Sequence, residues 1–379
     1  MKNWGRRIAV IVCAMAVVGL LCFALGGNLR WKTVPAAQEG NAISRAQADT
    51  SAFAAPQSGD ASSAARMEMD SNRPSIILAV GERVSLPAKI LTREGELYEG
   101  EIRCESSDSS VVDVDSEFLL GRSPGSALVM VYAGEMAEKF EATVVRYADL
   151  YDVEVFAHRG LGSGAPENSL EGIRAAVSTG AVGVEIDVRR TRDGVLVLSH
   201  DELINRTSDG MGRITDMTYE QLLGFDFYGT EICTLEQALQ AIRETGMQIL
   251  IEFKESSVVK DTVAMVQRYG LEEQAVYISF DLEQLRTALS VDPEAKTAFL
   301  YNKGSLSDWA IQVAAENGVW ALIPKHTILT ESLAAKIHAA GLRVGVYTVN
   351  TKAQFRKVYR MGLDWLITDY PSEMSNMLQ

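Results

Sequence analysis

Cysteine is scarce in this sequence, with four residues among 379. Cys13 and Cys22 lie in the first apolar run, which leaves Cys104 and Cys233 for the rest of the chain. We expect these two to belong to separate domains, although an oxidising compartment would permit them to pair. The sequence therefore argues against a structural disulfide.

Positive charge is also in deficit. Lysine and arginine number 36 against 50 aspartates and glutamates, which gives a net charge of −14 at pH 7. Such a chain repels phosphate backbones, so nucleic acid and other anionic polymers are excluded as non-specific electrostatic partners. A length of 379 residues with 47% hydrophobic content is enough for two or three domains with sizeable cores.

One long uncharged apolar run, residues 8–27, follows three basic residues near the amino terminus: Lys2, Arg6 and Arg7. The run is long enough to span a bilayer as a helix. The charge asymmetry places the amino terminus in the cytoplasm and the rest of the chain outside it. Residues 1–27 are therefore predicted to be a single-pass membrane anchor, and a cleaved signal peptide is the alternative.

The following segment, residues 28–73, is rich in Ala, Ser, Gln, Gly and Asp and holds few large apolar side chains. A segment of this composition buries too little surface to offset the entropy lost when it is ordered. We therefore expect a flexible linker between the anchor and the domains that follow.

Short runs of β-forming residues, separated by turn residues, fill residues 74–146. The runs are Ser75–Val80, Arg83–Leu86, Val111–Val114, Ala127–Tyr132 and Phe140–Val145. Because helical periodicity is absent, the pattern predicts a small antiparallel β-sandwich. The serine-rich run at 105–114, flanked by glycines, resembles the bacterial Ig-like domains of group 2. That resemblance implies a spacer, or a module that contacts the cell wall, without chemistry of its own.

A different pattern begins at residue 155. The apolar run 155–157 predicts a buried strand that ends at His158 and Arg159. Asn168, with Glu171 three residues later, matches a capping box, so a helix is predicted to start there.

Two carboxylates interrupt the next apolar run, at 181–188. Glu185 and Asp187 stand two residues apart, so on a strand they share one face at roughly 6–7 Å. Burying them unpaired is costly, because they repel one another and lose hydration. A hard cation such as Mg²⁺ or Ca²⁺ would relieve both problems, since such ions take carboxylate oxygens as ligands.

An Asp-Gly turn signal at 193–194 and a third apolar run then lead to His200 and Asp201. So short a turn predicts a hairpin, in which the returning chain brings His200 to the level of Glu185 and Asp187.

Four short motifs occur in this order: His-Arg-Gly at 158, Pro-Glu-Asn at 166, Glu-Ile-Asp at 185 and His-Asp at 200. Together they resemble the glycerophosphodiester phosphodiesterases, and the resemblance extends over residues 153–378. It implies a phosphodiester hydrolase that uses one divalent cation, Mg²⁺ or Ca²⁺, and a small-molecule glycerophosphodiester substrate.

The rest of the sequence alternates apolar runs with amphipathic segments. Besides strands near 155, 184 and 249, the predicted strands are Ala275–Phe280, Ala295–Leu300, Val319–Ile323, Arg343–Val349 and Trp365–Thr368. Helices are predicted from Thr234 and at Leu282–Ser290, Ser307–Asn317, Glu331–Ala340, Lys352–Arg360 and Pro371–Leu378. Eight such alternations within residues 151–379 predict an α/β fold, a (β/α)₈ TIM barrel with its active site at the carboxyl ends of the strands.

Glu252 and Lys254 share one face at the end of the strand near 249. A salt bridge between them is one interpretation, but burying such a pair is expensive. The resemblance instead favours Glu252 as the third metal ligand beside the pair on the preceding strand, with Lys254 as a phosphate contact.

The remaining motif residues receive roles from their chemistry and from the resemblance. His158 and His200 suit general acid–base catalysis, because imidazole titrates near neutrality. Arg159 suits a bidentate phosphate contact, and Glu167 is expected to orient the cation's water or His158 on the substrate side. Tyr347 stands where the family tends to carry an aromatic residue, which implies a flat wall against the substrate.

The sequence thus predicts a membrane-anchored, extracytoplasmic enzyme that cleaves glycerophosphodiesters to glycerol phosphate and an alcohol. A related activity on teichoic acid or lysophospholipid is the alternative among enzymes. The alternative outside enzymes is a catalytically silent barrel that binds the cell wall or lipid. Loss of a histidine or a metal carboxylate would favour the silent barrel, and neither is missing from the motifs.

Overall fold

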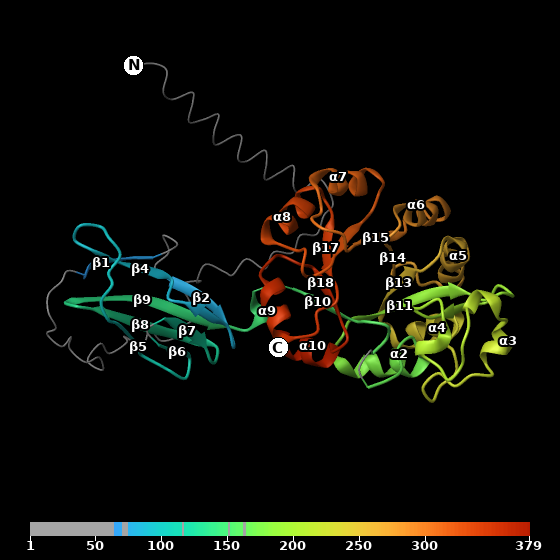
Figure 1. The fold of residues 1–379 in the computed structure, drawn as a ribbon, viewed down its shortest axis with the longest axis horizontal. Coiled ribbons are helices and arrows are strands. Elements are labelled where there is room, and N and C mark those ends of the chain that lie inside the picture. Colours follow the sequence, from blue (N-terminus) through green and yellow to red (C-terminus); the bar gives the residue numbers. More distant parts are fainter. Residues whose placement is uncertain (1–63, 70–74, 116, 151, 162–163) are drawn as a thin grey trace, which may run out of the picture.

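The computed structural model describes residues 64–69, 75–115, 117–150, 152–161 and 164–379. The predicted anchor at 1–27 and most of the predicted linker at 28–73 lie outside these residues. Among the described helices, none combines the length and apolar character needed to cross a membrane. The described chain forms a β domain followed by a barrel, and Figure 1 shows the two side by side.

Nine strands build the β domain. They are β1 (Ala64–Met69), β2 (Ser75–Ala79), β3 (Arg83–Ser85), β4 (Ala88–Thr92), β5 (Ile102–Ser106), β6 (Val112–Val114), β7 (Phe118–Gly121), β8 (Gly125–Ala133) and β9 (Met136–Val145). They form three small sheets with the strand orders β1-β4, β2-β9-β8-β5 and β3-β7-β6. Side chains from all three sheets share one core, which includes Leu78, Ile90, Leu119 and Val129.

Two expectations for this region are corrected. The domain is not purely antiparallel, because β2 pairs with β9 in parallel. Residues 64–69, which composition placed in the flexible linker, form β1 and pair with β4. Exposure alternates from Arg66 to Met69, and the two methionines, Met67 and Met69, are half-buried against the core. The segment pairs with β4 here because these two side chains find apolar neighbours on one face.

Eight parallel strands close into the predicted barrel. They are β10 (Glu154–Ala157), β11 (Gly183–Arg190), β13 (Gln248–Phe253), β14 (Ala275–Ser279), β15 (Lys296–Tyr301), β16 (Ala321–Pro324), β17 (Arg343–Val346) and β18 (Trp365–Thr368). Pairing of β10 with β11 completes the ring. The hairpin strand β12 (Leu196–Leu198) adds to β11 in antiparallel, as the turn signal predicted.

A helix follows each strand or hairpin of the barrel and lies outside the ring (Figure 1). The helices are α2 (Leu170–Ala176), α4 (Leu235–Thr245), α5 (Val259–Tyr269), α6 (Leu282–Val291), α7 (Asp308–Glu316), α8 (Glu331–Ala339), α9 (Lys352–Tyr359) and α10 (Pro371–Leu378). The predicted start of α4 at Thr234 is confirmed: the Thr234 side chain accepts from the backbone N–H of Gln237, and the Gln237 side chain accepts from the Thr234 backbone N–H. The (β/α)₈ prediction is thus confirmed, with strand ends shifted by a few residues.

Alternation along β11 sorts its side chains between two environments. Val184, Ile186 and Val188 belong to the core between the strands and the helices. The residues between them, Glu185 and Asp187, therefore face the barrel interior. Below them the interior is filled by a second cluster, which includes Phe156, Leu250, Ile278 and Trp365. The interior of the barrel is consequently filled with packed side chains, and the acidic groups lie at the carboxyl ends of the strands.

The chain between β12 and α4 forms a long loop at the carboxyl end of the barrel. It contains the short helix α3 (Tyr219–Leu222) and its own small core, which includes Ile204, Ile214 and Phe227. The loop is therefore a packed substructure rather than a loose connection.

The β domain is docked against α9. Tyr147, just after β9, packs edge-on against Phe355 and Tyr359, with ring centroids 5.1 and 4.6 Å apart. The Arg360 guanidinium donates to the Glu82 carboxylate at 2.6 Å. The two cysteines of the described chain, Cys104 and Cys233, are free thiols in different domains, as predicted.

Candidate active site

The residues singled out from the sequence motifs meet at the carboxyl end of the barrel. His158 directly follows β10, Glu185 and Asp187 lie in β11, His200 follows the hairpin strand β12, and Glu252 lies in β13. In-register pairing of β11 with β13 places Asp187 opposite Glu252. The parallel strands thus bring side chains from distant motifs to one level.

Three carboxylates form the centre of this site. Glu185, Asp187 and Glu252 each offer an oxygen, and these oxygens lie within 4.8 Å of one another. The three residues are buried, with 2%, 1% and 8% of their surfaces exposed. Burial, and then repulsion from Asp187, raises the pKa of both Glu185 and Glu252. The chain therefore concentrates more negative charge here than it neutralises.

One lysine reaches into the carboxylate cluster. The Lys254 ammonium lies 2.6 Å from Glu252 Oε1 and 3.3 Å from Asp187 Oδ1. Burial disfavours its charge, but the carboxylates outweigh burial and raise the pKa of Lys254. Burial by itself would raise the pKa of Asp187. The charge of Lys254 and weaker contributions from His200 and Arg159 together outweigh burial, and the pKa of Asp187 is lowered.

The donor set fits a divalent cation. Three carboxylates from two neighbouring strands are all-oxygen ligands at the spacing of one hard ion. One ammonium group leaves two glutamates with raised pKa values, and a doubly charged ion would offset that repulsion. The cluster can therefore bind a divalent metal, and its chemistry suits Mg²⁺ and Ca²⁺ alike.

Arg159 adjoins the cluster in an unusual backbone conformation. Its φ of 50° is left-handed, and its backbone N–H donates to Glu185 Oε2 at 2.8 Å. The guanidinium lies 3.2 Å from Glu167 and 3.7 Å from Asp187. Its Nε is buried and has no hydrogen-bond acceptor among the described residues. This Nε is the atom 3.7 Å from Asp187 Oδ2, beyond hydrogen-bond distance, so its N–H suits an anionic ligand such as phosphate.

His158 lies on one side of the cluster. Its Nδ1 is 2.5 Å from Asp369 Oδ1, and its Nε2 is 3.9 Å from Glu185 Oε2. Burial opposes protonation of the ring, but the hydrogen bond to Asp369 and the charge of Glu185 together raise the pKa of His158.

His200 lies on the hairpin side of the cluster. Its Nδ1 is 2.7 Å from Asp201 Oδ1. Burial lowers the pKa of His200, and the opposing attraction of Asp187 is the smaller effect. Both histidines therefore place Nδ1 against a carboxylate and keep Nε2 for other contacts, while their pKa values move in opposite directions.

Glu167 is placed differently from the expectation that it orients water or His158. Its carboxylate accepts two hydrogen bonds of 2.7 Å from Arg206, a residue of the long loop, besides its contact with Arg159. Arg206 also donates to Asp201 at 2.6 Å. Glu167 thus joins Arg159 to the His200–Asp201 pair through Arg206, and its role toward substrate stays a prediction.

The predicted capping role of Asn168 is wrong. Ser169 is the N-cap of α2, and its hydroxyl accepts from the backbone N–H of Gly172. Asn168 has a left-handed φ of 55°, and its amide donates to Asp187 Oδ2 at 2.8 Å while accepting from the Asp187 backbone N–H at 3.0 Å. The left-handed turn directs this side chain into the barrel, where it orients a candidate metal ligand.

Tyr347 follows β17 and is half-buried at the carboxyl end of the barrel, which is the mouth of the barrel. Its ring meets that of Phe280 edge-on, with centroids 5.9 Å apart, and burial raises its pKa. Phe280 follows β14 and is 41% exposed. The two rings pack together at the carboxyl end of the barrel. The role of Tyr347 as a wall against the substrate stays a prediction.

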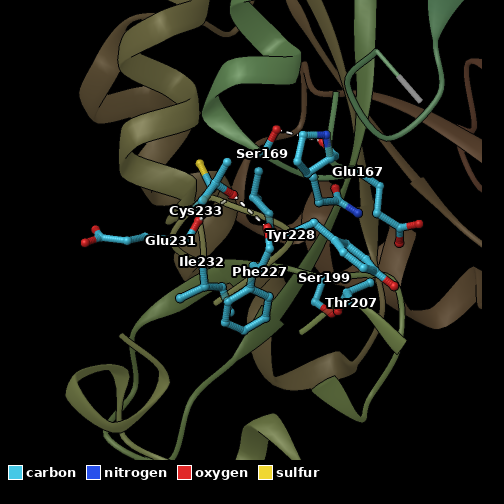
Figure 2. Close-up of a pocket in the computed structure, with 13 residues that line it drawn as sticks. Glu167, Ser169, Ser199, Thr207, Phe227, Tyr228, Glu231, Ile232 and Cys233 are labelled. Atoms are coloured by element: carbon cyan, nitrogen blue, oxygen red, sulfur yellow. Dashed lines mark hydrogen bonds between the residues drawn. The ribbon is translucent and has the colours of Figure 1, made fainter. Parts of the chain in front are cut away.

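A small cavity lies beside the carboxylate cluster rather than over it. Figure 2 shows it between Glu167 and Ser169 on one side and Phe227, Tyr228 and Cys233 on the other. Its volume of about 20 Å³ admits a water-sized molecule, and Glu185, Asp187 and Glu252 do not line it. This cavity is therefore not a place where a substrate would meet the three carboxylates.

The structure thus brings together eight of the nine predicted site residues around one centre, with Tyr347 at its rim. Four participants were not predicted as site residues: Asn168, Asp201, Arg206 and Asp369. Asp201 was visible in the His-Asp motif, and Asn168 in the Pro-Glu-Asn motif. Arg206 and Asp369 act across the fold, so no local pattern identified them.

Comparison with known proteins agrees with this geometry. The sequence model of the glycerophosphoryl diester phosphodiesterase family matches residues 158–373. A glycerophosphodiester phosphodiesterase of Caldanaerobacter subterraneus subsp. tengcongensis is 29% identical over 238 residues, which are 59% of this chain and 97% of that protein. Glycerophosphodiester phosphodiesterase 1 of Bos taurus is 30% identical over 240 residues, 52% of this chain and 72% of that protein.

Solved structures give the same result. A phosphodiesterase of Oleispira antarctica, solved in complex with the product sn-glycerol-3-phosphate, is 28% identical with a TM-score of 0.54, and the match covers 61% of this chain and 98% of that one. A glycerophosphodiester phosphodiesterase of Thermotoga maritima is 26% identical with a TM-score of 0.53, over 60% of this chain and 99% of that one. The matched region corresponds to the barrel.

Proposed function

From the premise that this chain belongs to the glycerophosphoryl diester phosphodiesterase family and is a glycerophosphodiester phosphodiesterase, we propose how its site works and where it acts. The proposed reaction is hydrolysis of a glycerophosphodiester to glycerol phosphate and an alcohol, dependent on one divalent cation. The product bound in the Oleispira antarctica relative supports this choice of product.

One observation carries the mechanism. Three buried carboxylates converge within 4.8 Å, and a histidine lies on each side of them with Nδ1 bound to an aspartate. A phosphodiester resists hydrolysis because its negative charge repels nucleophiles and its alkoxide leaving group is poor. A site for it must neutralise charge and move two protons.

Charge is neutralised by the cluster and its neighbours. Glu185, Asp187 and Glu252 would hold Mg²⁺ or Ca²⁺, which when bound would polarise a phosphate oxygen and offset its charge. Arg159 would supply the unpaired Nε–H to another phosphate oxygen. Lys254, already between two of the carboxylates, adds a second positive charge at the same place.

The two protons are moved by the two histidines. We propose that one takes the proton of the glycerol hydroxyl next to the ester carbon, and that this oxygen then attacks phosphorus. The bond from phosphorus to the alcohol breaks, and the other histidine protonates the departing oxygen. The roles then reverse: water adds to phosphorus and the five-membered cyclic phosphate opens to glycerol phosphate.

Intramolecular attack is supported by the effective concentration of a positioned hydroxyl, on the order of 10⁵ M or more in favourable cases. A deoxy substrate that lacks only the neighbouring hydroxyl tests the route. It should bind, measured as competitive inhibition, and hardly turn over. Hydrolysis of this analogue at the rate of the parent compound would mean that water attacks directly.

We also propose that the enzyme acts outside the cytoplasmic membrane. The support is in the sequence, where basic residues precede the uncharged run at 8–27 and a polar segment follows it. Protease added to intact cells with an accessible outer face should cut within this polar segment and release the β domain together with the barrel. Cleavage only after lysis would reverse the proposed topology.

The β domain is proposed to be an Ig-like spacer that contacts the cell wall. Among the described residues it contributes no member to the carboxylate cluster, and it contacts the barrel at α9 through Tyr147 and Glu82. Binding of isolated cell wall to the full chain, compared with a chain whose β domain is digested away, tests the wall contact.

A further inference from the structure

Asp369 lies at the end of the last barrel strand, 211 positions from the histidine it contacts. Strand β18 pairs with β10 so that Thr368 lies opposite Ala157, and the His158 backbone N–H donates to the Thr368 carbonyl at 2.8 Å. The next residue on each strand is therefore fixed beside the other. This register aligns the Asp369 carboxylate with His158 Nδ1 at 2.5 Å.

Asp369 is itself held by a second residue. Its Oδ2 accepts from the Asn350 amide at 2.5 Å, and its backbone N–H donates to Asn350 Oδ1 at 2.9 Å. The Asn350 backbone N–H in turn donates to Gln354 in the first turn of α9 at 2.8 Å. The carboxylate is thus fixed at both oxygens, one by Asn350 and one by His158.

A helix-capping use of Asp369 is not what the contacts show. Its position, two residues before Pro371, suits a residue that caps the last helix. The N-cap of α10 is instead Tyr370, and no side chain caps this helix. The two carboxylate oxygens instead contact His158, just after β10, and Asn350, between β17 and α9.

We propose that Asp369 is a positioning residue that holds the His158 imidazole by Nδ1 and presents its Nε2 to the carboxylate cluster. The His158 Nε2 lies on the Glu185 side, 3.9 Å from Oε2. A carboxylate that accepts from Nδ1–H selects the tautomer with the proton on Nδ1. Nε2 is then unprotonated, and its lone pair can accept a proton. The same arrangement at His200, through Asp201, supports the assignment independently.

The fold supplies a matched control on the same strand. Asp364 directly precedes β18 at the opposite end of the barrel, and its Oδ2 lies 3.1 Å from His338 Nε2. Asp364→Asn and Asp369→Asn therefore make the same chemical change to a histidine-bound aspartate. One change is at the site and the other is at the base of the barrel.

Steady-state hydrolysis of glycerophosphocholine, with Mg²⁺ or Ca²⁺ present, separates the two positions. Asp369→Ala should lower kcat by about 10- to 100-fold with little change in KM or melting temperature. Asp369→Asn, which keeps an acceptor but not the charge, should lie between Asp369→Ala and the wild type. Asp364→Asn should leave kcat unchanged.

Nitrogen NMR of labelled histidines reads the tautomer directly, and the chain has four histidines to resolve. Neutral His158 should carry its proton on Nδ1 in the wild type and shift toward the Nε2–H form in Asp369→Ala. His338, bonded through Nε2, should keep the opposite tautomer in both proteins and serves as the internal reference. An unchanged His158 tautomer in the variant would overturn the proposal.

The inference rests on the proposed catalytic role of His158, and the two can fail separately. Wild-type kcat in Asp369→Ala beside an inactive His158→Ala would overturn the positioning role alone. Wild-type kcat in His158→Ala would overturn the proposed role of His158 itself. If the alanine variant does not fold, the kcat of Asp369→Asn decides the question, and a wild-type value would overturn the positioning role.

Discussion

Strand β18 has an aspartate at each end, and each aspartate contacts a histidine, yet the two ends of the barrel are built for different purposes. At the base, Asp364 contacts His338, the backbone N–H of Val344 and the Arg343 guanidinium. Arg343 also reaches Glu154 at 3.5 Å and lies over the rings of Trp320 and Trp365. Acids and bases at this end balance one another within the chain.

The carboxyl end is unbalanced by comparison. Three buried carboxylates face one contacting lysine, and Arg159 keeps a donor without an acceptor. Leaving such groups unsatisfied costs stability. The difference between the ends teaches that charge at the mouth is arranged for a ligand, whereas charge at the base is arranged for the fold.

Removal of divalent metal should give the largest contrast between the ends. Chelation should abolish turnover, and added Mg²⁺ or Ca²⁺ should restore it, because the Glu185, Asp187 and Glu252 oxygens have too few cations of their own. Circular dichroism should show an intact barrel, since the base needs no ion. Asp187→Asn should weaken metal binding more than it weakens the metal-free fold. Full activity after exhaustive chelation would contradict the metal's role.

The histidines give the second largest contrast. His158→Ala or His200→Ala should lower kcat by about 10²- to 10⁴-fold, the range for losing a general acid or base, with the melting temperature nearly unchanged. His338→Ala, at the base, should do the reverse, with normal kcat and a lower melting temperature. Near-normal activity in either mouth variant would remove that histidine from the mechanism.

The two ends should also respond to pH with opposite slopes. Burial, then repulsion from Asp187, raises the pKa of Glu185 and Glu252 above 4.5. Their contribution to stability is full below that value and is lost as pH rises through the raised pKa. Burial of Asp364 opposes its charge, but His338 and the Val344 N–H outweigh it and hold the pKa below 3.8. Its contribution is present above 3.8 and is lost as pH falls through the lowered pKa.

Melting temperatures of the metal-free protein, followed from the acid range up to about pH 8, measure both slopes. Glu185→Gln should flatten the loss between about pH 4.5 and 8, and Asp364→Asn should flatten the loss below pH 3.8. Saturating metal should also flatten the loss between about pH 4.5 and 8, because it stabilises the ionised carboxylates. If Glu185→Gln leaves the dependence of the melting temperature on pH unchanged, the pKa of Glu185 is not raised in the folded protein.

The smallest expected effect belongs to the base alone. Arg343→Met removes two ion pairs of 3.4 and 3.5 Å and the contact with two indole rings. The free energy of unfolding in urea should fall by about 1 kcal/mol, typical of partly exposed pairs with a cation–π contact. The value of kcat should stay within about twofold of wild type, as expected for a change far from the site. A larger loss of kcat would show that the base is coupled to the mouth.

Local patterns in the sequence predicted much of this molecule. The alternation that put Glu185 and Asp187 on one face of an apolar run also put them on the inner face of β11. Glu252 was added to them by the resemblance to the family, and the structure places it in the same cluster. The turn at 193–194 predicted the hairpin that carries His200. These predictions succeeded because period, turn chemistry and strand length act within a few residues.

Contacts between distant segments were missed or misjudged. Asn168 matched a capping box, but its left-handed backbone turns the side chain to Asp187 instead. The composition of residues 64–69 predicted a linker. They form a strand because they pair with β4 and pack against the core of the β domain.

By itself the sequence determined the strands, the order of the motifs and the end of the barrel at which chemistry collects, because side-chain period and strand direction are local properties. Only the tertiary structure decided which carboxylate meets His158. Asp369 reaches His158 because closure of the ring sets β18 beside β10 in one register, and Arg206 reaches Glu167 because the long loop packs on its own core. Such pairings depend on how separate strands and loops pack against one another, and a short stretch of sequence does not specify that packing.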